Sequence, residues 1–95
     1  MLVLPATLTH AEAPACLDLL RKAVAAEAGA QVLVDATQLG RFDSSALAVL
    51  LALRRASGYQ GKSFAVRGLA PRLRTLAGLC GVGVLLPEPV QVPTS

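Results

Sequence analysis

The sequence predicts an α/β domain with a mainly parallel sheet of four to five strands and helices packed largely on one side. Short hydrophobic runs with a strand pattern alternate along the chain with segments whose apolar residues have helical spacing. Strands separated by helices require right-handed crossovers, which place the strands parallel in one sheet. Of the 95 residues 54% are hydrophobic and 3% aromatic, so the core is expected to consist of closely packed aliphatic side chains.

The first strand is expected within residues 2–9, with an edge position or a break near Pro5, because proline cannot donate to a ladder. The first helix then begins near Glu12 and ends near Ala26. Thr9 and Glu12 have the spacing of a capping box, in which side chains bond the free N–H groups of a helix start.

The central strand is expected at residues 31–35, where a continuous apolar run is typical of a strand buried on both faces. A helix follows, capped by Asp43 or Ser44 and continuing to about Ser57, where Gly58 is expected to stop it.

The next strand is expected at residues 63–67, followed by a third helix with Pro71 in its first turn. Residues 84–86 suggest a last short strand. We therefore expect a single domain over residues 1–87 and a flexible C-terminal tail over residues 88–95, which holds two further prolines after Pro87.

Composition restricts the class of protein. A net charge of +3 is too weak to indicate nucleic acid, and the aromatic residues are not interleaved with basic ones. Cys16 and Cys80 lie in apolar surroundings, which favours two reduced core thiols in a cytosolic protein. The uncharged run over residues 44–53 is too short for a spanning helix, and the N-terminus does not resemble a signal peptide. A cytoplasmic domain is expected.

No catalytic, metal or cofactor site is expected. The phosphate-binding, dinucleotide-binding and zinc-protease motifs are absent, and His10 is the only histidine. Asp35 follows the central strand and Asp43 precedes the next helix, so both could lie on the rim where parallel strands end.

The start of the second helix has two interpretations. Asp43, Ser44 and Ser45 are common helix-start residues, whose role can be capping alone. Alternatively, the Ser44 hydroxyl is exposed at the positive end of the helix dipole, where a phosphate would be stabilised.

The helix behind this start is apolar on more than one face. Leu47, Leu50, Leu51 and Arg54 fall on one face, and another face is formed by Ala46, Val49 and Leu53. Such a helix is either fully buried or contacts a partner, and full burial is difficult in so small a domain. The second half of the chain also carries basic residues that form either a solvated rim or a site for an acidic partner: Arg54, Arg55, Lys62, Arg67, Arg72 and Arg74.

The stretch over residues 32–47, with Asp43-Ser44-Ser45-Ala46-Leu47 at its turn, resembles the signature of STAS domains, the fold of anti-sigma-factor antagonists. The segment over residues 63–76 is similar to the family's strand-Gly-Leu-x-Pro-helix unit, and the resemblance extends over residues 2–86. Within the family the chain looks most like the small stand-alone STAS subunits of Mla phospholipid-transport ABC complexes of Gram-negative bacteria.

This resemblance implies a STAS fold and a non-enzymatic accessory subunit without cofactors. Its partner would be the cytoplasmic ATPase of the ABC complex, with the membrane permease contacted indirectly, so the subunit would lie peripherally at the inner membrane. The implied partner-binding residues are Arg41, Phe42, Asp43, Ser44, Ser45, Leu47, Ala48, Leu51, Arg54 and Arg55.

The resemblance also implies an alternative function. The hydroxyl residue directly after the Asp is phosphorylated by a partner kinase in the antagonist branch, and it corresponds to Ser44. The chain would then be an anti-sigma-factor antagonist, with an anti-sigma-factor kinase as its partner. In the Mla branch this residue is usually Thr and lies at the ATPase contact. Ala46 stands where the usual motif has Gly. Direct binding of a lipid or nucleotide is a third reading.

Overall fold

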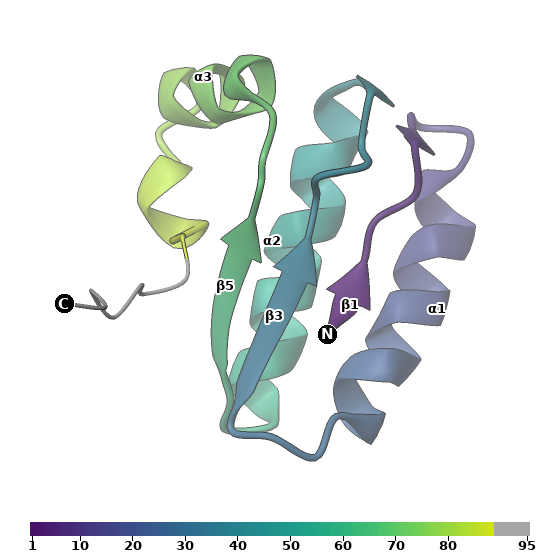
Figure 1. The fold of residues 1–95 in the computed structure, drawn as a ribbon, viewed down its shortest axis with the longest axis vertical. Helices are drawn as coiled ribbons and strands as arrows, with labels where there is room; N and C mark the ends of the chain where they lie inside the picture. Colours follow the sequence, from purple (N-terminus) through teal and green to yellow (C-terminus); the bar gives the residue numbers. More distant parts are fainter. Residues whose placement is uncertain (89–95) are drawn as a thin grey trace, which may run out of the picture.

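Three parallel strands form the main sheet in the order β1-β3-β5, as the computed structural model shows for residues 1–88, the part of the chain that it describes (Figure 1). These strands are β1 (Leu2–Val3), β3 (Gln31–Asp35) and β5 (Ser63–Arg67). Val34 in the middle strand is paired with Leu2 on one side and with Val66 on the other. The prediction of a parallel α/β arrangement is confirmed.

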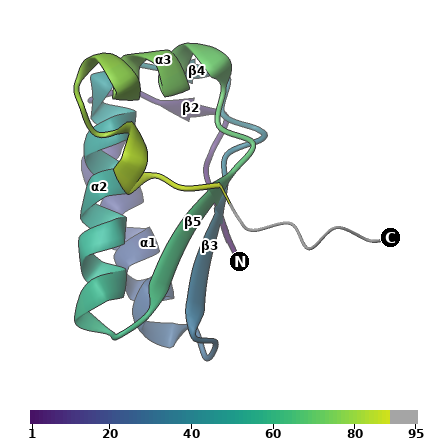
Figure 2. The same ribbon diagram turned by 90° about the vertical axis from the view of Figure 1, so that its left-hand side faces the viewer.

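Two long helices cover one face of this sheet, α1 (Ala13–Ala26) and α2 (Ser44–Tyr59) (Figure 2). The third helix, α3 (Pro71–Leu79), lies across the end of the domain where the strands finish. Its first residue is the proline expected there, since proline has no N–H to leave unbonded in a first helical turn.

The expectation of one sheet with four to five strands is wrong. A separate two-stranded parallel ladder pairs β2 (Thr7–Leu8) with β4 (Arg41–Phe42), so the strands divide three and two. The division occurs at Pro5, which follows the last bond to β3, from the Leu4 N–H to the Asp35 carbonyl at 2.9 Å. Pairing then resumes farther along, where the Ala6 carbonyl accepts from the N–H groups at positions 40 and 41.

Two other element boundaries differ from expectation. Residues 84–86 do not form a strand, because the chain makes a 3₁₀ turn over Gly83–Leu85 after Gly81, whose φ of 74° turns the backbone. Gly58 does not stop α2, which continues through it to Tyr59, and the left-handed turn falls on Gly61 with φ 69°. Of the expected tail, all but Glu88 lies outside the described residues.

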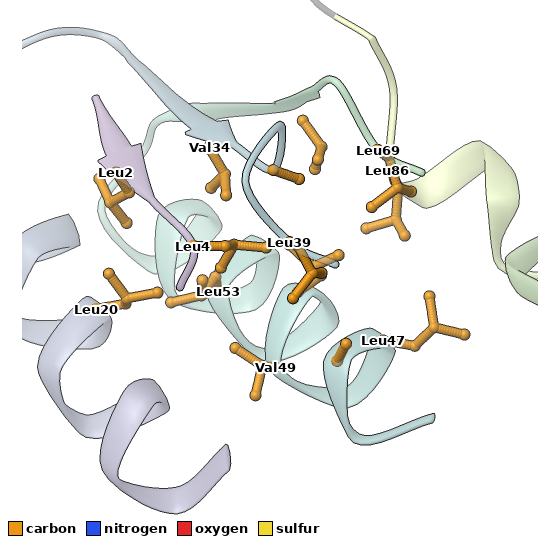
Figure 3. Close-up of a cluster of buried hydrophobic side chains, with 14 of the residues drawn as sticks. Leu2, Leu4, Leu20, Val34, Leu39, Leu47, Val49, Leu53, Leu69 and Leu86 are labelled. Atoms are coloured by element: carbon orange, nitrogen blue, oxygen red, sulfur yellow. The ribbon is translucent and has the colours of Figure 1, made fainter. Parts of the chain in front are cut away.

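The core fills the space between the sheet and the two long helices. Leu4, Leu20 of α1 and Leu53 of α2 point into the same volume (Figure 3). Ser57 is the one buried polar residue of the described chain, and its hydroxyl donates to the Leu53 carbonyl at 2.8 Å. This bond removes the cost of burying the hydroxyl.

The two cysteines are not both core thiols. Cys16 is half-buried on α1, and this burial raises the pKa of its thiol. Cys80 follows the last residue of α3 and is exposed, so its expected core position is wrong. The side chains of α3 that do pack inward are Leu73 and Ala77, one turn apart.

Candidate functional site

Asp43 holds the start of α2 in place. One carboxylate oxygen, Oδ1, accepts from the Ser45 N–H at 2.8 Å, which is the geometry of an N-cap. The other, Oδ2, accepts from the His10 N–H at 3.1 Å and so joins this helix to the segment that leads into α1. These N–H donors, that of Ser45 first, hold the pKa of Asp43 below its ordinary value. The predicted cap is therefore Asp43 and not Ser44.

Asp35 and Asp43 accept hydrogen bonds from different donors. The Asp35 carboxylate accepts from the hydroxyl of Thr37 at 2.7 Å and from its N–H at 2.9 Å, and these bonds lower the pKa of Asp35. The bonds of Asp35 thus stay within its own turn, whereas Asp43 bonds both to Ser45 in its turn and to the distant His10. In residues 1–88 no three His, Cys, Asp or Glu side chains come together as metal ligands would.

Thr9 and Glu12 pair, but not as a full capping box. The Glu12 carboxylate accepts from both the Thr9 N–H, at 2.9 Å, and the Thr9 hydroxyl, at 2.8 Å, which lowers the pKa of Glu12. The hydroxyl therefore donates to the carboxylate, and no side chain caps the first N–H groups of α1. The pairing instead fixes the loop from which His10 reaches Asp43.

Ser44 is the first residue of α2 and is exposed, while Ser45 is half-buried. Residues farther along the same side of α2 are also accessible, and together with Ser44 they form one surface. We define the outer face of α2 as Ser44, Ala48, Leu51, Ala52, Arg55 and Tyr59, which are all exposed or half-buried. Their spacing of three or four residues places them on one side of the helix.

Leu47 does not belong to this surface. Its side chain is 5% exposed and belongs to the same core as Leu50. Figure 3 shows Leu47 and Leu53 among the buried side chains. The predicted excess of apolar surface on α2 is therefore mostly core packing, since α2 contacts α1, β5 and α3 on different sides. The partner-binding role that the resemblance implies for Leu47 stays a prediction, although the burial of its side chain leaves little of it accessible to a partner.

Arg54 and Arg55 lie on different sides of α2. Arg54 lines a hollow with Phe64 of β5 and Pro87. Arg55 lines a groove between α1 and α2, which it shares with Arg21. Two basic residues that are adjacent in sequence thus line different hollows.

Arg41 and Phe42 form β4, immediately before Asp43. Arg41 is exposed, whereas Phe42 is half-buried and lies beneath Arg72 of α3, whose guanidinium carbon is 5.5 Å from the ring centroid. This cation–π contact joins the lead-in of α2 to α3. Sequence reasoning placed Arg72 only among general basic residues, because no local pattern indicates which ring it covers.

Beside this pair lies a groove of about 580 Å³ between the start of α2 and α3. Phe42 and Asp43 line it together with three residues of α3, Arg72, Leu76 and Leu79. Leu79 is 82% exposed. Sequence reasoning missed this contribution of α3, although the apolar residues at positions 76 and 79 are spaced by one helical turn.

No helix among residues 1–88 combines the length and the apolar character that crossing a membrane requires. A protein-family model described as "Mlab, STAS domain" matches residues 1–87, which include every element described above. None of the curated proteins compared with the chain matches it.

Proposed function

The chain belongs to the STAS domain family, and on that premise we propose that it is a non-enzymatic accessory subunit of a phospholipid-transport ABC complex. Its partner is the cytoplasmic ATPase of that complex, and it reaches the membrane permease only indirectly. The description of the matching family as Mlab supports this assignment. The sequence resembles the STAS subunits of Mla complexes, which transport phospholipids.

The observation that carries the proposal is the exposed Ser44 on a helix start that is already fixed. Asp43 anchors this turn to His10, and Arg72 covers Phe42 directly before it. A surface that is already ordered before binding loses little conformational entropy when a partner binds. Ser44 and Ala48 are small, so a partner can approach the helix backbone closely along the outer face of α2.

A binding surface of this kind requires no catalytic group and no cofactor. The proposed docking residues are the accessible members of the predicted set at the start of α2 and on its outer face: Arg41, Phe42, Asp43, Ser44, Ser45, Ala48, Leu51 and Arg55. Arg54, which lies on another side of α2, is left out with Leu47.

Co-purification tests the proposal. We expect the tagged chain to retain an ABC ATPase from a phospholipid transporter when the two are co-expressed, and a Ser44→Arg substitution to reduce the amount retained. Leu47→Asp is unsuitable as an interface test, because a buried charge would unfold the domain. Normal retention of the ATPase by Ser44→Arg would exclude the proposed surface.

The exposure of Ser44 also favours a second candidate, an anti-sigma-factor antagonist switched by a kinase. A phosphate on this first helical residue would lie at the positive end of the α2 dipole. Intact-mass measurement after incubation with candidate anti-sigma-factor kinases distinguishes the two functions. A mass increase of one phosphate in the wild type, absent in Ser44→Ala, would favour the switch, and an unchanged mass would favour the transport subunit.

A further inference from the structure

A groove of about 380 Å³ lies between the C-terminal halves of α1 and α2. Its apolar surface comes from Val24 and Ala25 of α1 and from Ala52 and Ala56 of α2. Because three of these four side chains are methyl groups, the two helices leave space between them. The lining spans little more than one helical turn of α1, about 6 Å, and about two turns of α2, roughly 10 Å.

Two arginines border this groove, Arg21 on α1 and Arg55 on α2. Both are exposed, and no carboxylate of residues 1–88 forms a salt bridge with either one. The acidic residues of α1 and its end are paired elsewhere, Asp18 with Lys22 at 3.3 Å and Glu27 with the N-terminal amine at 3.4 Å. The groove thus has two positive charges and no negative one among its lining residues.

The electrostatics at the end of α1 reinforce this positive character. The Lys62 ammonium donates to the Val24 carbonyl at 2.9 Å and also to the Glu27 carbonyl. These carbonyls belong to the negative end of the α1 dipole, which would otherwise oppose an anion nearby. Lys62 offsets that charge, so Arg21 and Arg55 determine the sign of the local potential.

We propose that this groove binds an acidic helical segment of a protein partner. Carboxylates of the segment pair with Arg21 and Arg55, and its small apolar residues pack on Ala52 and Ala56. Tyr59, which is 84% exposed at the edge of the groove, contributes an aromatic contact of the kind that is enriched in binding hot spots.

The geometry favours a peptide helix over a lipid headgroup. The groove runs between two helices and continues into the outer face of α2, with which it shares Ala52, Arg55 and Tyr59. An amphipathic helix can cover such a strip and its charged border together. A headgroup would satisfy the arginines but leave the alanine surface uncovered. The inference rests on the proposed function, in which the outer face of α2 contacts the partner, and it adds the chemistry of that partner.

Titration of the full chain with a synthetic peptide tests the inference. The probe is an amphipathic helix with glutamates at i and i+4 and alanine and leucine on its other face. The comparison peptide carries lysines in place of the glutamates. In two-dimensional amide NMR at low salt, we expect the acidic peptide to shift the signals of Ala25, Ala52 and Gln60, and the lysine peptide to leave them unchanged.

Arg54 supplies a matched control, since it is adjacent to Arg55 but lines another hollow and not this groove. We expect Arg55→Gln and Arg21→Gln each to weaken binding of the acidic peptide about tenfold, since each removes a charge that pairs across the interface. Arg54→Gln should leave the affinity within about twofold. Equal losses for the three variants would overturn the inference, because they would indicate general attraction to net positive charge.

Vesicles of phosphatidylglycerol provide the competing ligand. If the chain binds these vesicles through Arg21 and Arg55 but does not bind the acidic peptide, the ligand of the groove is a lipid surface and the inference is overturned. The result is separable from the proposed function, because the peptide titration needs no ATPase. If the chain retains the ATPase but does not bind the acidic peptide, the proposed docking function stands and the inference about this groove is overturned.

Discussion

The carboxylate of Asp43 accepts a hydrogen bond from the N–H of His10 at 3.1 Å, across 33 positions of sequence. The same carboxylate caps α2 through Ser45. One side chain therefore fixes both the start of the helix that presents Ser44 and its position relative to the loop before α1.

Replacing Asp43 should lower stability in graded steps. Asp43→Ala removes both bonds, whereas Asp43→Asn keeps one oxygen that can accept from Ser45 but leaves the His10 N–H without its acceptor. We expect the midpoint of urea unfolding to fall in the order wild type, Asp43→Asn, Asp43→Ala. Equal midpoints for the wild type and Asp43→Ala would show that the cap and the bridge contribute nothing.

Stability should also decline in acid. The pKa values of Glu12, Asp35 and Asp43 are below their ordinary values in the folded protein because N–H and hydroxyl groups donate to the carboxylates. A carboxylate with a lowered folded pKa stabilises the fold above its unfolded pKa, and this contribution is lost as the pH falls through the folded pKa. The loss should begin near pH 4.5 for Glu12 and near pH 3.8 for the aspartates, and continue below.

The measurement is urea unfolding at a series of pH values for the wild type and Asp43→Asn. Since asparagine does not titrate, the advantage of the wild type should be largest above pH 4 and shrink below it. An advantage that is constant down to pH 2 would contradict the assigned role of the Asp43 charge.

Gly68 should tolerate no side chain, for two reasons that can be separated. Its φ is 70°, and an added Cβ would collide with the Thr37 methyl carbon and lie 3.3 Å from the Thr37 Cα. Gly61 has a similar φ of 69° but open space around it. Gly61→Ala should cost roughly 1 kcal/mol from backbone strain alone, and Gly68→Ala roughly 2–3 kcal/mol.

The double variant Gly68→Ala/Thr37→Ser isolates the collision, since serine lacks the methyl group but keeps the hydroxyl that donates to Asp35. Its loss should approach that of Gly61→Ala in chemical unfolding. If Gly68→Ala and Gly61→Ala cost the same, the contact with Thr37 is unimportant.

Lys62 should stabilise the end of α1. Lys62→Met keeps the length of the side chain but removes the donors to the carbonyls of Val24 and Glu27, at a cost of about 2 kcal/mol. Lys22→Met, which removes only an exposed pair with Asp18, should cost less than about 1 kcal/mol. Faster amide exchange at the end of α1 should accompany the first substitution and not the second.

The sequence was sufficient for features that depend on local patterns. The three helices, the strands at residues 31–35 and 63–67 and a helix cap at Asp43 or Ser44 follow from periodicity, turn residues and helix-start chemistry, and the structure selects Asp43. The STAS family was recognisable from the Asp-Ser-Ser turn and the later Gly-Leu-x-Pro segment, and the family match confirms it.

Features that depend on distant contacts were not predictable. The two-residue strand β4 exists because Ala6 offers its carbonyl to residues 40 and 41, and nothing in the local sequence marks it. Similarly, burial of Leu47 depends on the neighbours that surround α2. Arg55 and Arg21 line the same groove because α1 packs against α2, and Arg54 does not line it.

The central claim is that the outer face of α2 binds an ABC ATPase. Replacing two exposed alanines with arginine, one on this face and one outside it, tests the claim most directly. Ala48 lies on that face, and Ala26 is exposed at the end of α1 outside it. Both variants should keep the unfolding midpoint of the wild type, since both sites are exposed. In calorimetric titration of the purified ATPase, Ala48→Arg should weaken binding at least about tenfold, because an arginine blocks close approach of the partner, and Ala26→Arg should bind normally. Equal affinities of Ala48→Arg and the wild type would contradict the account.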